Sequence, residues 1–89
     1  MKEQMDAAKE RLDHISVKGE CQGVTVISNG NKKITELVIS NETYASAKKE
    51  EIAELVVLAT NRALENAERV FESEMRGMAG GLIGGLGLF

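Results

Sequence analysis

The sequence predicts an α+β protein: a first helix, then a three-stranded antiparallel meander, then a long C-terminal helix. Three observations lead to this fold class. Apolar residues recur at helical spacing near the N-terminus, and β-branched residues alternate with polar ones between about residues 15 and 40. The chain also contains no proline, so nothing breaks the apolar stripe between about residues 48 and 78. A length of 89 residues predicts a single domain, and no internal repeat divides it.

The first element, about residues 1–13, is predicted to be an amphipathic helix. Met1, Met5, Ala8 and Leu12 recur at a spacing of three or four residues, and charged residues fill the other faces.

Two strands with a β-branched, alternating pattern follow this helix. Ile15 and Val17 alternate with polar residues, which is the period of a half-buried strand. The run VTVIS then opens directly after Gly23. The dipeptide Asn29-Gly30 predicts a hairpin with a type I′ turn, because both residues accept a positive φ.

A third strand is predicted at residues 32–40. Ile34 and Val38 are expected to point one way, and Leu37 and Ile39 the other. Because its end is apolar on both faces, this strand is expected to be central or to lie between two layers.

The last element is a helix predicted from about residue 48 to residue 78. Ser46 is its candidate N-cap, and Gly77 followed by Gly80 and Gly81 is expected to end it. The predicted domain therefore covers residues 1–78, and residues 79–89 form a glycine-rich tail that is expected to be flexible. The apolar positions of the helix form one stripe: Ile52, Leu55, Val56, Ala59, Ala63, Ala67, Val70 and Met75.

This helix is too long for the predicted sheet. About 29 residues span roughly 44 Å, whereas strands of about seven residues span roughly 23 Å. Val70, Phe71, Met75 and Met78 would therefore extend beyond the sheet, and the first helix is too short to cover them all. Since an exposed apolar stripe is unusual on a monomer, a homodimer is predicted. The residues predicted to hold the dimer or the core are Leu55, Ala59, Ala63, Ala67, Val70 and Met75.

Composition excludes several classes of protein. Eleven basic and fourteen acidic residues give a net charge of −3, which counts against simple binding of polyanions. No apolar run reaches 18 residues and the N-terminus lacks a signal-peptide core, so an intracellular protein with no membrane partner is expected. A single cysteine, Cys21, forms no intrachain disulfide and suits a reducing cytosol, although a cross-dimer disulfide on oxidation stays open.

No catalytic, metal or cofactor site is predicted. His14 is the only histidine and lacks a Cys/His partner at metal-ligand spacing, and Cys21 has no activating neighbour in the pattern. The glycine-rich end follows a helix instead of opening one, so it does not match a phosphate loop. The many glutamates of the long helix are interpreted as a solvated face. Neither an enzyme nor a small-molecule binder is therefore expected.

The basic residues offer a binding hypothesis. Lys2, Lys9 and Arg11 belong to the first helix, and Arg62, Arg69 and Arg76 are spaced by seven along the long helix. Seven residues are close to two turns, so these three arginines share a stripe that rises roughly 21 Å and that could follow a DNA backbone. The alternative is that the arginines pair with glutamates of their own helix, such as Glu65 with Arg69 and Glu72 with Arg76.

Several segments occur together in a fixed order: MKEQMDAAKERL, VKGECQGVTV, SNGN, LVISNETY and EEIAELVVLATNRA, followed by the glycine-rich end at Phe89. In order, spacing and length they resemble the YbaB/EbfC family of bacterial nucleoid-associated proteins. The sequence departs from the family pattern at Ser40-Asn41, where an acidic residue and a proline are common. It also lacks the usual glycine-rich leader and a proline near its end.

The resemblance implies a tweezer-like homodimer that binds double-stranded DNA in the cytoplasmic nucleoid with little sequence preference, contributing to nucleoid organisation or gene regulation. It implies DNA contacts on the first and last helices, hence at Lys9, Arg11, Arg62, Arg69 and Arg76, with Lys2 as a weaker candidate. The alternative function is a protein-interaction module that uses the apolar helix end around Met75, Met78 and Leu82.

Overall fold

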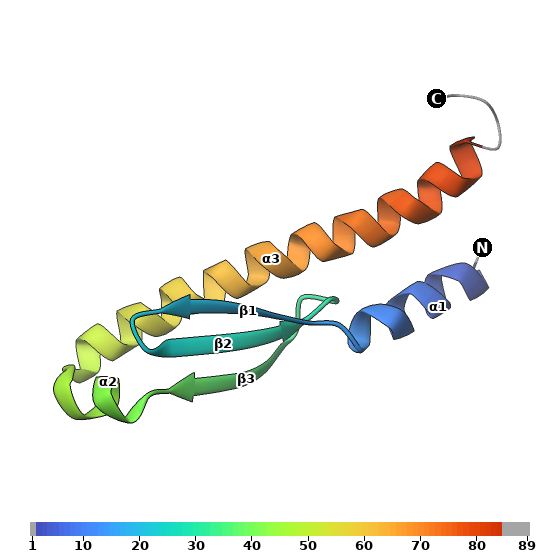
Figure 1. The fold of residues 1–89 in the computed structure, drawn as a ribbon. Helices are drawn as coiled ribbons and strands as arrows, with labels where there is room; N and C mark the ends of the chain where they lie inside the picture. The colour runs from blue at the N-terminus through green and yellow to red at the C-terminus, as the bar shows by residue number, and fades with distance from the viewer. Residues whose placement is uncertain (1, 85–89) are drawn as a thin grey trace.

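The predicted order of elements is confirmed in a computed structural model, which describes the backbone of residues 2–84 and the side chains of residues 5–77. The molecule is elongated, with principal extents of 57 × 23 × 15 Å. The longest helix runs along the sheet and extends past the ends of the strands, where it contacts the first helix (Figure 1). The elements are α1 (Lys2–Asp13), β1 (Ser16–Cys21), β2 (Val24–Asn29), β3 (Ile34–Ile39), α2 (Asn41–Ser46) and α3 (Lys49–Gly84).

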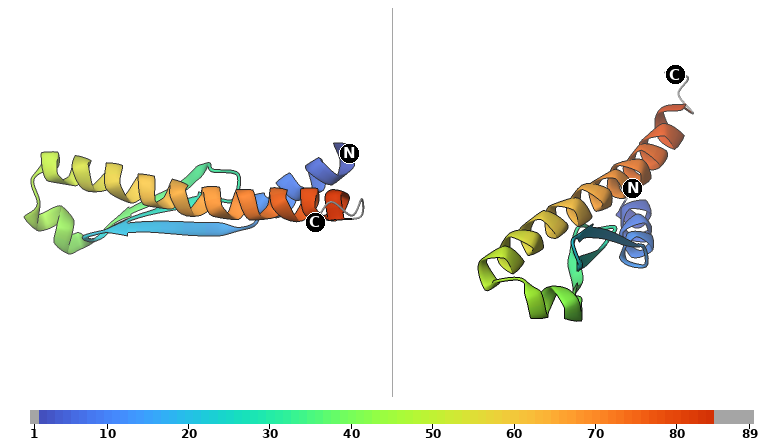
Figure 2. Two further views of the ribbon diagram at one scale, coloured as in Figure 1. Left: turned by 90° about the horizontal axis from the view of Figure 1, so that it is seen from above. Right: turned by 60° about the vertical axis from the view of Figure 1, so that its left-hand side comes forward.

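The sheet is an antiparallel meander in the order β1-β2-β3. Helix α3 packs on one face, over β1 and β2 (Figure 2). The expectation of a central third strand is wrong for the single chain, because β3 is an edge strand and most of its residues are exposed. A bulge at Ile27/Ser28 also places Ile34 opposite Ser28, so Ile34 shares a face with Leu37 and not with Val38.

The predicted type I′ turn at Asn29-Gly30 is wrong. The two consecutive positive φ values lie in the β1–β2 turn, at Gln22 (45°) and Gly23 (89°). In the β2–β3 turn the left-handed residue is Lys32, with φ of 65°. Gly30 instead donates its N–H to the carbonyl oxygen of Leu12 at 2.8 Å, so this turn caps the C-terminal end of α1.

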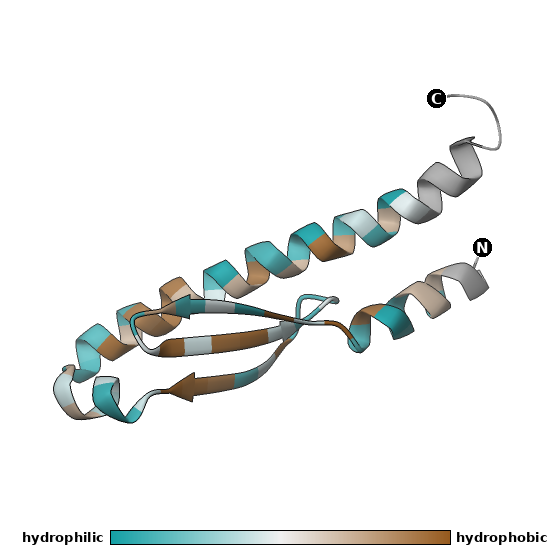
Figure 3. Cartoon of the chain, in the orientation of Figure 1, coloured by the Kyte–Doolittle hydropathy of each residue, from teal (hydrophilic) through white to brown (hydrophobic). Residues whose placement is uncertain are grey.

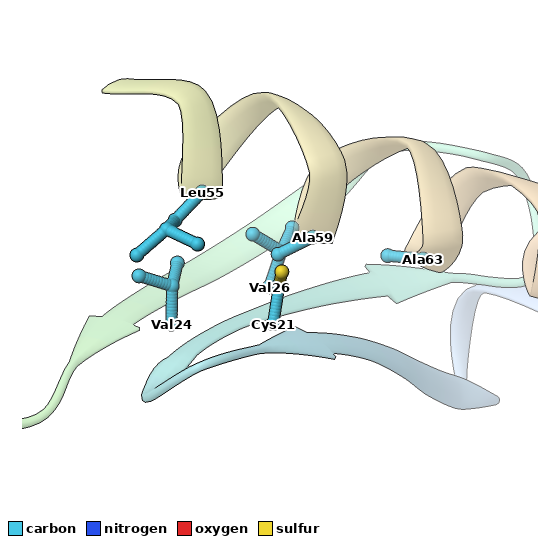
Figure 4. Packing of buried hydrophobic residues seen from close by; sticks show 6 residues of the cluster. All are labelled: Cys21, Val24, Val26, Leu55, Ala59 and Ala63. Atoms are coloured by element: carbon cyan, nitrogen blue, oxygen red, sulfur yellow. The ribbon is translucent and has the colours of Figure 1, made fainter. Parts of the chain in front are cut away.

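The core consists of small side chains between α3 and the sheet. Figure 4 shows Leu55, Ala59 and Ala63 of α3 facing the valines of β2 and Cys21 of β1. Apolar residues run along β2 in the core and also along the end of β3, where Leu37 and Val38 stay exposed (Figure 3). Alanines bring the helix close to the strands, and β1 meets it with a glycine, Gly19, as its inward residue.

Beyond the sheet, α3 is partly covered by α1. Ala8 and Leu12 of α1 and Ala67 of α3 are fully buried, and the two helices are in contact. The first helix therefore does cover part of the overhang. Val70 and Met75 of α3 remain half-buried.

Two helix boundaries differ from the prediction. The connection after β3 contains the short helix α2, whose N-cap Ser40 accepts the N–H of Thr43 at 3.1 Å. Ser46 closes α2 and does not cap α3, since its hydroxyl donates to the carbonyl oxygen of Glu42.

Helix α3 passes through Gly77 and continues to Gly84, so it has 36 residues and measures roughly 54 Å. The predicted end near residue 78 is wrong, because glycines inside a helix lower its stability without necessarily ending it. Residues 85–89 of the predicted tail lie outside the described residues, and the domain boundary stays a prediction. Within the described part, no helix is long and apolar enough to cross a membrane.

Candidate nucleic-acid interface

The predicted arginine stripe lies on one exposed flank of α3. Arg62, Arg69 and Arg76 are all exposed, and an ideal helix turns them by only about 20° per heptad. Arg62 donates to the carbonyl oxygen of Glu20, and the Asn66 amide donates to that of Lys18 at 2.8 Å. The stripe therefore follows the β1 side of the helix, on the opposite flank from β3.

The predicted pairing of these arginines with glutamates of the same helix is not present among the described side chains. Neither Glu65–Arg69 nor Glu72–Arg76 forms an ion pair there. Arg69 donates to the amide oxygen of Asn66 at 3.1 Å instead. Amide and backbone oxygens orient a guanidinium without neutralising it, so the charges of the stripe stay available to an anion.

The two DNA-binding candidates on α1, Lys9 and Arg11, have different surroundings in the structure. Arg11 forms an ion pair with Glu74 of α3, with its Nε 2.8 Å from Oε1. Lys9 is exposed and lies two positions away, which is about 200° around the helix. Lys9 thus fits a role at the surface, whereas the charge of Arg11 is already balanced. The side chain of Lys2 lies outside the described residues.

Most of the predicted dimer stripe is buried inside the single chain. Leu55, Ala59, Ala63 and Ala67 are at most 9% exposed, so a second chain could not reach them; Val70 and Met75 are half-buried. Sequence reasoning did not predict which apolar residues remain exposed. Five of them lie on β3 and on the first half of α3: Ile34 (44%), Leu37 (48%), Val38 (45%), Val57 (57%) and Leu58 (48%). Met5 of α1 and Tyr44 of α2 are exposed as well. The two-sided apolar pattern of β3 is the signal in the sequence that points to the three residues of that strand.

The β2–β3 turn contributes one further polar cluster. The Nζ of Lys32 lies 3.0 Å from Oε2 of Glu68 and 4.3 Å from the ring centroid of Phe71. The hydrogen bond from Lys32, aided by its positive charge, lowers the pKa of Glu68 below its ordinary value. His14 is exposed and Cys21 is buried; within residues 5–77 no three His, Cys, Asp or Glu side chains gather into a metal-binding group.

The chain thus combines a helix–meander–helix fold with an exposed arginine stripe on its longest helix, an arrangement suited to binding nucleic acid. Residues 1–82 match the model of the YbaB/EbfC DNA-binding family. The chain belongs to this family.

Curated relatives support the assignment. A nucleoid-associated protein of Caldanaerobacter subterraneus subsp. tengcongensis is 34% identical over 83 residues, covering 91% of this chain and 75% of the relative. One from Acetivibrio thermocellus is 33% identical over 91 positions, covering 100% of this chain and 80% of the relative. One from Bacillus cereus is 38% identical over 80 residues, covering 88% of this chain and 73% of the relative.

The fold also occurs in a solved structure. The crystal structure of an uncharacterised protein from Helicobacter pylori superposes with a TM-score of 0.77, covering 89% of this chain and 85% of that one. At 18% identity, this likeness shows a shared fold.

Proposed function

We propose that this protein is a homodimeric, cytoplasmic, nucleoid-associated protein that binds double-stranded DNA with little sequence specificity and has no enzymatic activity. It would contribute to nucleoid organisation or gene regulation. The observation that supports this most is the exposed stripe of Arg62, Arg69 and Arg76, unneutralised by the neighbouring glutamates, in a chain of a DNA-binding family.

The mechanism is attraction between guanidinium groups and phosphates. The stripe rises roughly 21 Å, and the phosphates of one DNA strand recur every roughly 3.4 Å of helix axis, so a stripe of this length could contact several phosphates. Contacts to phosphates fix the position of a protein on the duplex without reading its sequence. Lys9 would add a contact from α1. Low sequence specificity follows from this chemistry.

The second copy of the chain would cover the exposed apolar residues of β3 and the first half of α3. Leu37 pairs with Val26 of the core, and Val57 lies two residues before Ala59 of the same core, so both belong to one end of the molecule. Among the side chains of residues 5–77, none that is fully buried is larger than leucine, which leaves a small core. Burial of the exposed apolar residues of β3 and α3 between two chains would add to this core.

The test of DNA binding is a salt series with duplexes of unrelated sequence. The observed affinity should fall steeply with salt and differ little between the duplexes. An affinity that does not change with salt, or no binding at low salt, would contradict the proposal.

The alternative of a protein-interaction module is supported by a shallow groove on α3 lined by Glu68, Phe71, Glu72, Met75 and Arg76. A pull-down from nuclease-treated lysate separates the two functions. A stoichiometric protein that survives nuclease treatment supports the module, whereas loss of all partners with the nucleic acid supports DNA binding. Met78 and Leu82, also predicted to take part, have side chains outside the described region.

A further inference from the structure

The turn between β2 and β3 contacts both helices on which DNA-binding residues are proposed. On one side it holds α1. The Nδ2 of Asn31 donates to the carbonyl oxygen of Lys9 at 2.9 Å and to Oδ1 of Asp13 at 2.6 Å. The N–H of the preceding residue, Gly30, donates to the carbonyl oxygen of Leu12.

On the other side the same turn holds α3. The Lys32 ammonium pairs with Glu68 and lies over the ring of Phe71. Lys32 follows Asn31 directly and has a positive φ of 65°. Two neighbouring side chains of the turn therefore contact different helices: Asn31 contacts α1 and Lys32 contacts α3.

The turn is also braced internally. The Oδ1 of Asn29 accepts the N–H of Asn31 at 2.9 Å and that of Lys33 at 3.2 Å. These bonds lie within the turn and brace its shape, so the turn can serve as a support for α1.

We propose that Asn31 is a positioning residue for DNA binding: it holds α1, and Lys9 with it, in a fixed place relative to the arginine stripe of α3. This inference rests on the proposed function. An isolated helix of 12 residues is marginal in water, so α1 is held by tertiary contacts. Buried Ala8 and Leu12 pack it against α3, whereas the Arg11–Glu74 pair is exposed and contributes little. The direct bond from Asn31 to the Lys9 carbonyl thus restrains the backbone that presents this lysine.

The test compares Asn31→Ala with Thr43→Val. Asn31 is uncharged, so its removal deletes no charged group that could pair with a phosphate. The Thr43 hydroxyl also makes two bonds: it donates to the carbonyl oxygen of Gln22 at 2.8 Å and accepts the Ser40 hydroxyl at 2.9 Å. Thr43 belongs to α2, at the end of the sheet opposite α1, so its variant controls for the general effect of losing two side-chain bonds (Figure 1).

We expect Asn31→Ala to weaken binding to a 30-base-pair duplex roughly threefold to tenfold and to reduce the slope of log K against log salt by about 0.9 for each phosphate that the variant no longer binds. Thr43→Val should retain the wild-type slope. If Asn31→Ala keeps the wild-type affinity and slope, or changes them only as Thr43→Val does, the inference is wrong.

Amide hydrogen exchange gives a second, independent readout. In Asn31→Ala, the amides of α1 should exchange faster than in the wild type while those of α3 exchange at unchanged rates. Unchanged exchange in α1 would also overturn the inference. A wild-type protein without salt-dependent DNA binding would refute the proposed function instead, and the exchange data would then still decide whether Asn31 holds α1.

Discussion

Gly19 of β1 lies directly against the backbone of Ala59 in α3. A Cβ atom at Gly19 would stand 2.2 Å from the carbonyl oxygen of Ala59 and 2.3 Å from the backbone nitrogen of Ala63. Neither backbone atom can move without shifting the helix. The close approach at Gly19 sets the distance between α3 and the sheet, and through it the position of the arginine stripe along β1.

Replacement of Gly19 by alanine should therefore destabilise the fold strongly. We expect the free energy of unfolding to fall by about 3 kcal/mol or more, at the upper end of overpacking effects, because backbone and not a flexible side chain must shift. Urea denaturation followed by far-UV circular dichroism measures this. A loss below about 0.5 kcal/mol, the range of ordinary surface substitutions, would show that the helix does not pack as closely as described.

Gly77→Ala is the matched control. A Cβ there meets nothing within 4 Å, and the residue lies inside α3. Alanine should stabilise the helix by about 0.5–1 kcal/mol, because it loses less backbone entropy on folding than glycine. Destabilisation in the same urea experiment would argue against a continuous helix at this position.

Much of this fold follows from local patterns in the sequence. Alternation in β1 and β2 and the proline-free stripe of α3 predict the elements, because one face of each must be buried. Other features depend on tertiary contacts. The local pattern around Gly30 predicts the β2–β3 hairpin correctly but not its turn type, because Gly30 caps α1 through a partner 18 residues earlier in the chain. Helix α2 does have a local signal, the capping residue Ser40, which the apolar pattern alone does not reveal.

The candidate site, like the fold, can be predicted from the sequence only in part. The spacing of Arg62, Arg69 and Arg76 shows from sequence alone that they share a stripe. The pairing of Arg11 cannot be found in this way, because Glu74 lies 63 residues away. Nor does helical periodicity separate residues that face their own sheet, such as Ala59, from those that stay exposed, such as Val57.

The Arg11–Glu74 pair makes a prediction about charge. Because Glu74 already balances Arg11, the double variant Arg11→Gln/Glu74→Gln should leave DNA affinity within about twofold of the wild type, since net charge is unchanged. A double-mutant cycle on stability should give a coupling of about 0.2–1 kcal/mol, as for other exposed pairs. If Arg11→Gln alone weakens DNA binding as much as Arg76→Gln does, Arg11 contacts DNA after all.

The lowered pKa of Glu68 predicts a pH dependence of stability. The folded carboxyl holds its charge to lower pH than the unfolded one, whose pKa is about 4.3. Its contribution is therefore complete above that value and is lost as pH falls through the lower folded pKa. The melting-temperature difference between wild type and Glu68→Gln should be constant from pH 7 to pH 6 and shrink in acid. A difference that grows in acid would show that the pKa of Glu68 is raised by folding and not lowered.

The proposed dimer surface is tested by single acidic substitutions. Leu37→Glu and Val57→Glu would place a charge among apolar residues at an interface, so both should shift the protein from dimer to monomer in sedimentation velocity at micromolar concentration. Ser73→Glu adds the same charge to an exposed position of α3 and should stay dimeric. A wild type that sediments as a monomer, or two variants that remain dimers, would contradict this surface.

The central claim is that the arginine stripe of α3 contacts DNA phosphates, and one measurement tests it most directly. The salt dependence of duplex binding is compared for the wild type, for Arg62→Ala/Arg69→Ala/Arg76→Ala, and for Lys33→Ala/Lys48→Ala/Lys49→Ala. The second triple variant removes the same charge from exposed positions outside the stripe.

The arginine variant should bind at least about tenfold more weakly, and the slope of log K against log salt should fall by about 0.9 for each phosphate that is no longer bound. The lysine variant should stay close to the wild type in slope. Equal weakening in both triple variants, or an arginine variant that binds like the wild type, would show that the stripe is not the DNA-binding surface.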